Sequence, residues 1–265
     1  MLKIAALQMN SGGDVRKNLV SADILIRQAV LAGATFVATP ENTPYMGTLE
    51  NKVALAEGAS GPIGKFFSAL AAELKIHLLL GSFCEKAGIP GKCRNTALLF
   101  GPDGGLRSKY SKINLFDVDI QGKVRNRESD TVAAGREVKV CGTSFGAVGM
   151  AICFDLRFPA HFQALRKKGA ELICVPSAFT SHTGRDHWEA LLRARAIETQ
   201  TYVIAPSQVG LHGDEGLPES HGHAMIIDPW GCVLAERLDP TPGFVMAEID
   251  LRYQEKVRKE MPIFQ

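Results

Sequence analysis

Three residues whose side chains could do chemistry each stand at or just after the end of an apolar run. They are Glu41, Lys112 and Cys153. Because α/β sheets bind ligands at the ends of their strands, residues in such positions converge from distant parts of the chain. A thiol can attack a carbonyl, a carboxylate can take the thiol proton, and an ammonium can stabilise the developing negative charge. The three residue types together make up a set of groups with which a cysteine could act as a nucleophile.

Each of these residues also has an ordinary structural interpretation when it is considered alone. A Glu after a strand is typical of a solvated loop or a helix cap, and a single Lys is typical of the surface. A Cys inside an apolar run is typical of the core. Their positions alone leave the catalytic and the structural interpretations open.

The elements that must position these residues follow from the apolar periodicity. We expect strands over residues 3–9, 35–39, 76–81, 147–153, 171–175, 202–206 and 244–249, and helices over 15–29, 63–74, 159–168 and 187–200. Hairpins are expected at 95–111 and 222–235, and a polar helical tail after residue 250. This alternation predicts an α/β fold in which helices cover mixed sheets. Residues 115–135 are expected to form a long irregular loop of functional importance.

Composition and charge exclude several classes of protein. The 265 residues are 46% hydrophobic and carry a formal net charge of +2, which is typical of a globular chain with no nucleic-acid partner. Apolar stretches fall short of the roughly 20 residues that a membrane-spanning helix needs, and the N-terminus does not resemble a signal peptide. The six cysteines show no close pairing pattern. We therefore expect reduced thiols and a cytoplasmic protein.

Three local segments resemble the signature blocks of the nitrilase superfamily of carbon–nitrogen hydrolases. They are PEN at 40–42, KYSKINLFD at 109–117 and CFDLRFP at 153–159. The resemblance extends from the first predicted strand to residues 261–265. It implies a four-layer-type αββα sandwich, a single carbon–nitrogen hydrolase domain over residues 1–265, and a homodimer. The sequence contains no Gly-x-Gly-x-x-Gly or Walker motif, so we expect no cofactor, and we expect no metal.

The same resemblance assigns roles to individual residues. The superfamily's catalytic triad maps onto Glu41, Lys112 and Cys153, and its further acidic residue maps onto Glu128. It implies that Glu41 takes the proton of Cys153, and that Lys112 and the backbone N–H of Phe154 hold the oxyanion. We further expect the cationic Lys112 to lower the pKa of the Cys153 thiol.

Other segments resemble the Nit branch of the superfamily, which includes deaminated-glutathione amidase and ω-amidase. They are PSAF at 176–179, HWE at 187–189, LRARAIETQ at 192–200, HAM at 223–225 and DPWG at 228–231. The 192–200 segment is more similar to the former enzyme, and FDVDI at 116–120 to the latter. The resemblance implies a small linear amide as substrate, most simply deaminated glutathione, with α-ketoglutaramate, a carbamoyl amine or a nitrile as alternatives.

A substrate that carries a carboxylate needs a cation, because Arg side chains bind carboxylates with two parallel hydrogen bonds. Arg157, just beyond the nucleophile, and Arg185, in the segment 181–185 that we expect to be a loop, are the candidates. Their structural alternatives are an ion pair between Arg157 and an acid at the edge of the core, such as Asp155, and a solvated charge at Arg185.

Two motifs are typical of other kinds of site, a serine-hydrolase elbow and a zinc site. A further alternative is a non-catalytic binding protein. Residues 142–146 match the Gly-x-Ser-x-Gly elbow of serine hydrolases around Ser144, but an apolar strand follows where that motif needs a helix, which predicts a turn. His221 and His223 could share one strand face, but no third ligand with zinc spacing is near. A non-catalytic binding protein of the same fold would be expected to lack a triad residue, and all three are present here.

Overall fold

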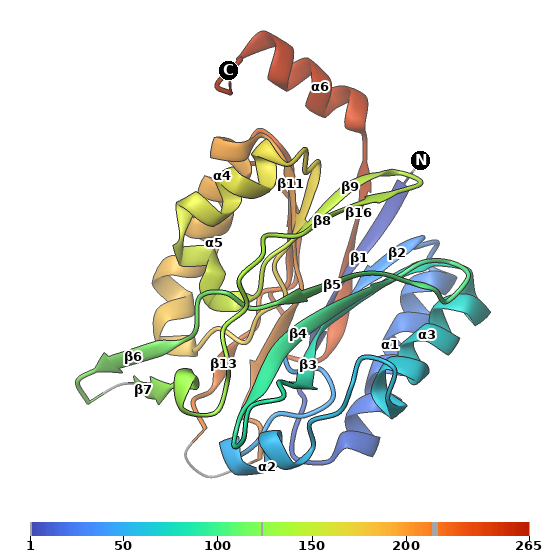
Figure 1. Cartoon of the computed structure of the whole chain (residues 1–265). Coiled ribbons are helices and arrows are strands. Elements are labelled where there is room, and N and C mark those ends of the chain that lie inside the picture. The colour runs from blue at the N-terminus through green and yellow to red at the C-terminus, as the bar shows by residue number, and fades with distance from the viewer. Residues whose placement is uncertain (1, 123, 214–216, 265) are drawn as a thin grey trace.

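The computed structural model describes residues 2–122, 124–213 and 217–264, so Gln265 of the predicted C-terminal segment lies outside the described residues. Two β-sheets lie face to face, and helices cover the outer face of each (Figure 1). The expected αββα sandwich is therefore confirmed.

The larger sheet contains the N-terminal strands. Its order is β13 (Ser220–His221), β12 (Ser207–Gly210), β1 (Leu2–Met9), β2 (Phe36–Ala38), β3 (His77–Lys86), β4 (Cys93–Phe100) and β5 (Leu106–Ser111), and β16 (Gly243–Ile249) pairs with β1. β1, β2 and β3 run parallel, whereas β4 and β5 continue as antiparallel hairpin strands. The outer face of this sheet carries α1 (Val15–Leu31) and α3 (Pro62–Leu74), and α2 (Leu49–Ala54) precedes α3.

The second sheet belongs to the C-terminal half. Its order is β15 (Val233–Glu236), β14 (Met225–Ile227), β11 (Tyr202–Ala205), β10 (Leu172–Cys174), β9 (Gly146–Met150) and β8 (Val140–Thr143). β9, β10 and β11 run parallel. α4 (Pro159–Lys167) and α5 (Ser181–Thr199) cover its outer face (Figure 1).

The alternation of side chains along β1 shows how the layers are held together. Ile4 and Ala6 face the second sheet and join a core cluster with residues of β9, β10 and β11. Ala5 and Leu7 face the other way and pack with the apolar stripe of α1 and α3. Because successive strand residues point to opposite faces, one apolar strand serves both layers.

Most expected elements are confirmed, and three expectations are wrong. The 147–153 strand ends at Met150, after which Cys153–Arg157 form a 3-10 helix, η2. Residues 115–135 are not irregular throughout, because β6 (Asp117–Ile120) and β7 (Val124–Arg127) pair as a hairpin before the short helix η1 (Glu128–Asp130). The helix expected over 187–200 begins at Ser181. Short elements such as these depend on tertiary contacts more than on periodicity.

The C-terminal helix α6 (Leu251–Glu260) lies beyond one end of the sandwich (Figure 1). Arg258 fastens it, donating to the carbonyl oxygens of Gln200 (3.1 Å) and Ala170 (3.1 Å). Gln200 Nε2 in turn donates to the Met261 carbonyl (2.7 Å).

Candidate active site

Glu41 lies in the segment after β2, where the chain passes close to β3. A Cβ atom at Gly81 would lie 2.0 Å from the carbonyl oxygen of Thr39, so only glycine allows the two segments to approach this closely. Beyond it, the Asn42 N–H donates to Ser82 Oγ (2.8 Å), and Gln208 Nε2 donates to the Glu41 carbonyl (2.9 Å). Contacts from β3 and β12 thus fix the backbone that presents this carboxylate.

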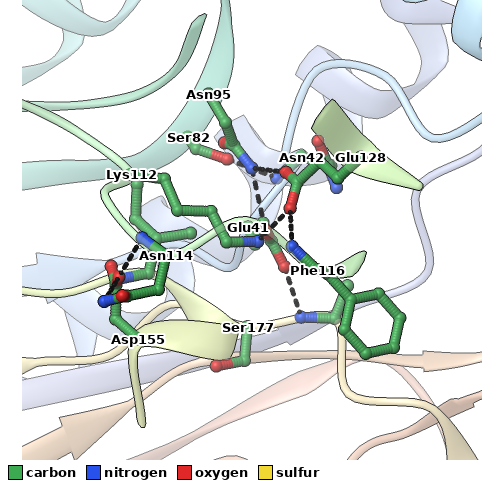
Figure 2. A network of polar contacts seen from close by, with 12 residues as sticks. Glu41, Asn42, Ser82, Asn95, Lys112, Asn114, Phe116, Glu128, Asp155 and Ser177 are labelled. Carbon is green, nitrogen blue, oxygen red and sulfur yellow. Dashed lines mark hydrogen bonds and ion pairs between the residues drawn. The ribbon is translucent and has the colours of Figure 1, made fainter. Parts of the chain in front are cut away.

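Lys112 follows β5 directly and joins two carboxylates. Its Nζ lies 2.9 Å from Glu41 Oε1 and 2.9 Å from Glu128 Oε2 (Figure 2). The three residues are 2%, 3% and 8% exposed, respectively. Charges are stable in such an environment only when they are paired and hydrogen-bonded, so the surface interpretation of Lys112 does not apply.

Asn95 of β4 forms a second link between the same carboxylates. Its Nδ2 donates to Glu41 Oε1 (2.8 Å) and to Glu128 Oε1 (3.1 Å) (Figure 2). The other oxygen of Glu41, Oε2, accepts the backbone N–H of Ala178 at 3.0 Å. The N–H of Phe116 donates to Glu128 Oε2 (2.7 Å). Both carboxylates are therefore held by donors from several segments.

Cys153 is the first residue of η2 and is 7% exposed. Its φ of 48° lies in the left-handed region, which residues other than glycine rarely adopt. The Cys153 N–H donates to the Pro176 carbonyl (2.9 Å), which joins the end of this turn to the segment after β10. The thiol thus stands on a sharp turn between two strand ends.

Asp155 fastens this turn to the segment that follows Lys112. One oxygen accepts the Tyr110 hydroxyl (2.6 Å) and the Ile152 N–H (2.9 Å). The other accepts the N–H (2.9 Å) and Nδ2 (2.8 Å) of Asn114 (Figure 2). The carboxylate is fully buried and its hydrogen bonds are occupied. The expected alternative of an Arg157–Asp155 ion pair is therefore wrong, because Asp155 serves the backbone of the site instead.

The electrostatics of the thiol differ from the expectation. Burial raises the pKa of the Cys153 thiol well above its ordinary value, and the facing Glu41 carboxylate raises it further. Lys112 and the Ala178 N–H act in the expected, lowering direction but are outweighed. Because the resting thiol is protonated at neutral pH, attack requires a base, and Glu41 is within hydrogen-bonding reach of the thiol.

The charges of Lys112 and Glu128 support each other. Burial opposes the charge of Lys112, but the carboxylates of Glu128 and Glu41 raise its pKa well above the ordinary value. Burial likewise opposes the charge of Glu128, whereas Lys112, the Phe116 N–H and Asn95 together lower its pKa. The site thus keeps a permanent cation next to two carboxylates, which suits the stabilisation of an oxyanion.

A narrow cavity opens beside the thiol. Its lining includes Cys153, Phe154, Arg157, Phe179 and Thr183. The Arg157 guanidinium lies 5.1 Å from the centroid of the Phe179 ring and 5.8 Å from that of Phe154. Burial lowers the pKa of Arg157 from its usual high value, and a guanidinium remains charged at neutral pH despite such a shift. A cation therefore faces the space where a substrate would meet the thiol.

The structure places Arg185 differently. It is exposed near the start of α5, where its Nε donates to the Ser181 carbonyl (3.3 Å), so the loop expected over 181–185 is helical. Among the described residues, those that line the cavity beside Cys153 do not include Arg185. Ser144 lies in the tight turn between β8 and β9, as predicted for a turn rather than a nucleophile elbow.

His221 and His223 stack with ring centroids 4.3 Å apart, and His223 Nδ1 lies 2.7 Å from Glu236 Oε1. In the part of the chain that the structure describes, no group of three or more His, Cys, Asp or Glu residues could hold a metal ion. Nor does any helix of the described ranges combine the length and apolarity needed to cross a membrane.

Sequence patterns did not single out Asn95, the Ala178 N–H or the role of Asp155. Asn95 begins an apolar run, residues 95–100, and a polar residue entering a buried strand is a signal that could have identified it. A backbone donor such as that of Ala178 carries no side-chain signal. Its position depends on the path of the chain after β10.

Comparison with known proteins identifies the family. Residues 3–259 match the carbon–nitrogen hydrolase family. This chain is a carbon–nitrogen hydrolase. The hydrolase is 42% identical over 264 residues to a deaminated glutathione amidase of Synechocystis sp., covering 98% of this chain and 96% of that protein.

Two further comparisons place this carbon–nitrogen hydrolase in the Nit branch of the nitrilase superfamily, as expected. An omega-amidase of Xenopus tropicalis is 40% identical over 249 residues, or 93% of this chain and 88% of that protein. The crystal structure of the C. elegans NitFhit protein matches with a TM-score of 0.92 and 39% identity, covering 99% of this chain and 64% of that one. The hydrolase is therefore an amidase-type enzyme with the αββα fold of its superfamily.

Proposed function

We propose that this chain is a thiol-dependent amidase that hydrolyses a small linear amide to a carboxylate and ammonia. The observation that carries the proposal is the buried Glu41–Lys112–Glu128 network behind the thiol of Cys153. It provides a nucleophile, a base and a fixed cation within one site.

In the first half-reaction, the Sγ proton of Cys153 moves to Glu41 as the sulfur forms a bond to the amide carbon. The carbonyl electron pair moves to oxygen, where Lys112 and the N–H of Phe154 stabilise it. Phe154 lies in the first turn of η2, whose leading N–H groups have no partner within the helix. The C–N bond then breaks as the proton on Glu41 passes to nitrogen. Ammonia departs, and the acyl group remains bound to Cys153 as a thioester.

In the second half-reaction, Glu41 takes a proton from water as the water oxygen attacks the thioester carbon. The tetrahedral oxyanion forms in the same place and collapses to release the carboxylic acid. The proton on Glu41 returns to sulfur, which restores the thiol. Glu128 keeps Lys112 oriented throughout, because its Oε2 holds Nζ at 2.9 Å.

Deaminated glutathione is the substrate that we favour, and α-ketoglutaramate is the alternative. Relatives named deaminated glutathione amidase and omega-amidase are 42% and 40% identical to this chain, which supports these two amides. Arg157 supports a carboxylate at the far end of the substrate, because its guanidinium lines the cavity beside the thiol. Two parallel hydrogen bonds to that carboxylate would orient the carbonyl toward sulfur.

Ammonia release from a panel of substrates tests the proposal. The panel contains deaminated glutathione, α-ketoglutaramate, asparagine, a carbamoyl amine and an aryl nitrile. One of the first two should lead in kcat/KM by at least about tenfold, or about 1.4 kcal/mol of transition-state preference. Cys153→Ala should abolish turnover, whereas Ser144→Ala should not.

Other outcomes would contradict specific parts of the proposal. A leading nitrile or carbamoyl amine would refute the substrate class. Activity retained in Cys153→Ala would refute the mechanism, and a wild-type protein inactive on the whole panel would favour a binding protein.

We also propose that the chain forms one domain and works as a cytoplasmic homodimer. The described cysteines are free thiols, which supports a reducing compartment. Ile197 of α5 and Trp230 of the β14–β15 turn are 43% and 54% exposed, and Ile263 near the C-terminus is 47% exposed. Exposed apolar side chains of this size support burial against a second copy.

A further inference from the structure

The two oxygens of Glu41 differ in how their lone pairs are used. Oε1 accepts from Lys112 Nζ (2.9 Å) and from Asn95 Nδ2 (2.8 Å). A carboxylate oxygen offers about two lone-pair sites, so these two donors occupy Oε1 fully. Figure 2 shows both donors converging on this carboxylate.

The second oxygen keeps one site open. Oε2 of Glu41 accepts one hydrogen bond, from the Ala178 N–H (3.0 Å), so its second lone pair is available for another donor. The Glu41 carboxylate raises the pKa of the Cys153 thiol, and of its two oxygens Oε2 accepts one donor where Oε1 accepts two. The proton of the thiol therefore has one acceptor atom available.

We propose that Asn95 is a positioning residue that occupies Oε1 of Glu41 and so reserves Oε2 as the atom that accepts the Cys153 proton. This inference rests on the proposed function, in which Glu41 is the base. Asn95 does not touch the reacting atoms itself. It acts through Glu41 and, by its second hydrogen bond at 3.1 Å, through Glu128.

The surroundings of Asn95 indicate that packing alone does not account for an amide here. The residue is 4% exposed on β4, and its Oδ1 is buried with no hydrogen-bond partner. An unpaired buried oxygen destabilises the folded state. Its amide nitrogen, by contrast, meets two carboxylates, and its own carbonyl accepts the Lys112 N–H (2.9 Å). The orientation of the side chain therefore pairs its Nδ2 with both carboxylates and leaves its Oδ1 unpaired.

Removing the amide should change the pH at which the base works. Without Asn95 Nδ2, a lone pair of Oε1 becomes open and both carboxylates lose a shared donor. Hydrogen bonds to a charged carboxylate favour its charged form, so their loss favours protonation. The base is then protonated at a higher pH, and the acid limb of the activity profile moves upward.

The experiment compares Asn95→Leu and Asn95→Asp with the wild-type enzyme. Both retain the approximate volume of the side chain and lack its donors, and Asp adds a third negative charge. The acid-limb midpoint of kcat/KM for ammonia release should rise by about one pH unit in Asn95→Leu and further in Asn95→Asp. Activity at pH 7 should fall roughly tenfold or more and partly recover at higher pH, with KM little changed.

Asn18→Leu provides the matched control. Asn18 is 5% exposed, and its Nδ2 donates to the carbonyls of Gly12 (2.7 Å) and Pro44 (2.9 Å), away from the carboxylates. Its substitution should lower Tm without moving the pH profile. If the Asn95 variants lose activity equally at every pH, with the midpoint unchanged, Asn95 is merely structural and the inference is overturned.

Alkylation of Cys153 by iodoacetamide separates this inference from the proposed function, because it needs no substrate. Its rate should rise with pH, and the midpoint of that rise should move upward in both Asn95 variants. A protein inactive on every amide but with this shift would refute the amidase assignment alone. An unchanged alkylation profile in an active enzyme would refute the role of Asn95 alone.

Discussion

The buried lysine between two carboxylates is the feature on which the site depends at the scale of single residues. Lys112 pairs with both Glu41 and Glu128 at 2.9 Å, and all three side chains are buried. Because burial keeps the Cys153 thiol protonated, Lys112 contributes by stabilising the oxyanion rather than by creating a resting thiolate. Preorganised charge in a dry site is more effective than the same charge in water.

Lys112→Met should therefore reduce both stability and activity. Removing one partner of a buried ion pair costs about 3 to 5 kcal/mol, because the remaining charge is left uncompensated. Urea unfolding should show this loss, and kcat should fall by a factor of roughly 100 or more. Lys3→Met is the control, since Lys3 pairs with Glu248 at 3.6 Å and the two side chains are 43% and 50% exposed. That change should cost no more than about 1 kcal/mol and retain activity, and equal losses in both variants would contradict the assignment.

At the scale of elements, β13 packs against α5, the helix whose Thr183 lines the cavity beside Cys153. A Cβ atom at Gly184 of α5 would lie 2.3 Å from His221 Cγ, so the glycine allows the helix to pack directly on this imidazole. Burial, with the nearby His223 and Arg185, lowers the pKa of His221 to about 4. The imidazole of His221, packed between β13 and α5, is therefore uncharged at neutral pH.

The pH dependence of stability should report this contact. An unfolded histidine titrates near about 6.5, so between about pH 4 and 6.5 the unfolded state binds more protons. Stability should therefore rise with pH through this window and level off above it. His221→Phe should reduce the rise in unfolding free energy between about pH 4 and 6.5 by about 1 kcal/mol after allowance for partial exposure. That corresponds to about 2 to 4 °C in Tm. His182→Phe, at an exposed residue of the same helix, should leave the gain intact. A wild-type slope in His221→Phe would contradict this account.

At the scale of the whole molecule, the outer end of α5 and the β14–β15 turn form one apolar surface. Ile197 contacts this turn closely enough that a Cβ atom at Gly231 would lie 2.5 Å from its Cγ1, and Arg193 Nε donates to the Gly231 carbonyl (2.9 Å). Trp230 continues the surface and is 54% exposed. The proposed homodimer would cover these side chains.

Light scattering tests the dimer. The chain has a mass of 28.7 kDa, so a dimer should give 2 × 28.7 = 57.4 kDa at micromolar concentration. Ile197→Arg should shift the mass toward the monomer, because a charge at an apolar interface is costly to bury. Leu31→Arg is the control, since Leu31 at the end of α1 is 87% exposed and lies outside this surface. A monomeric wild type, or equal dissociation in both variants, would contradict the proposal.

The long elements, and the residue types that the site needs, could be predicted from the amino-acid sequence. α1, α3, β1 and β16 carry strong apolar periodicity, and the segments around Glu41, Lys112 and Cys153 are local enough to be recognised along the chain. How these residues meet depends on long-range contacts that no local pattern specifies. The positive φ of Cys153, the donors of Asn95 and Ala178, and the hydrogen bonds of Asp155 depend on segments far apart in sequence. Burial then set the protonation of the thiol against the expectation from Lys112, because desolvation depends on the surrounding fold and not on neighbours in sequence.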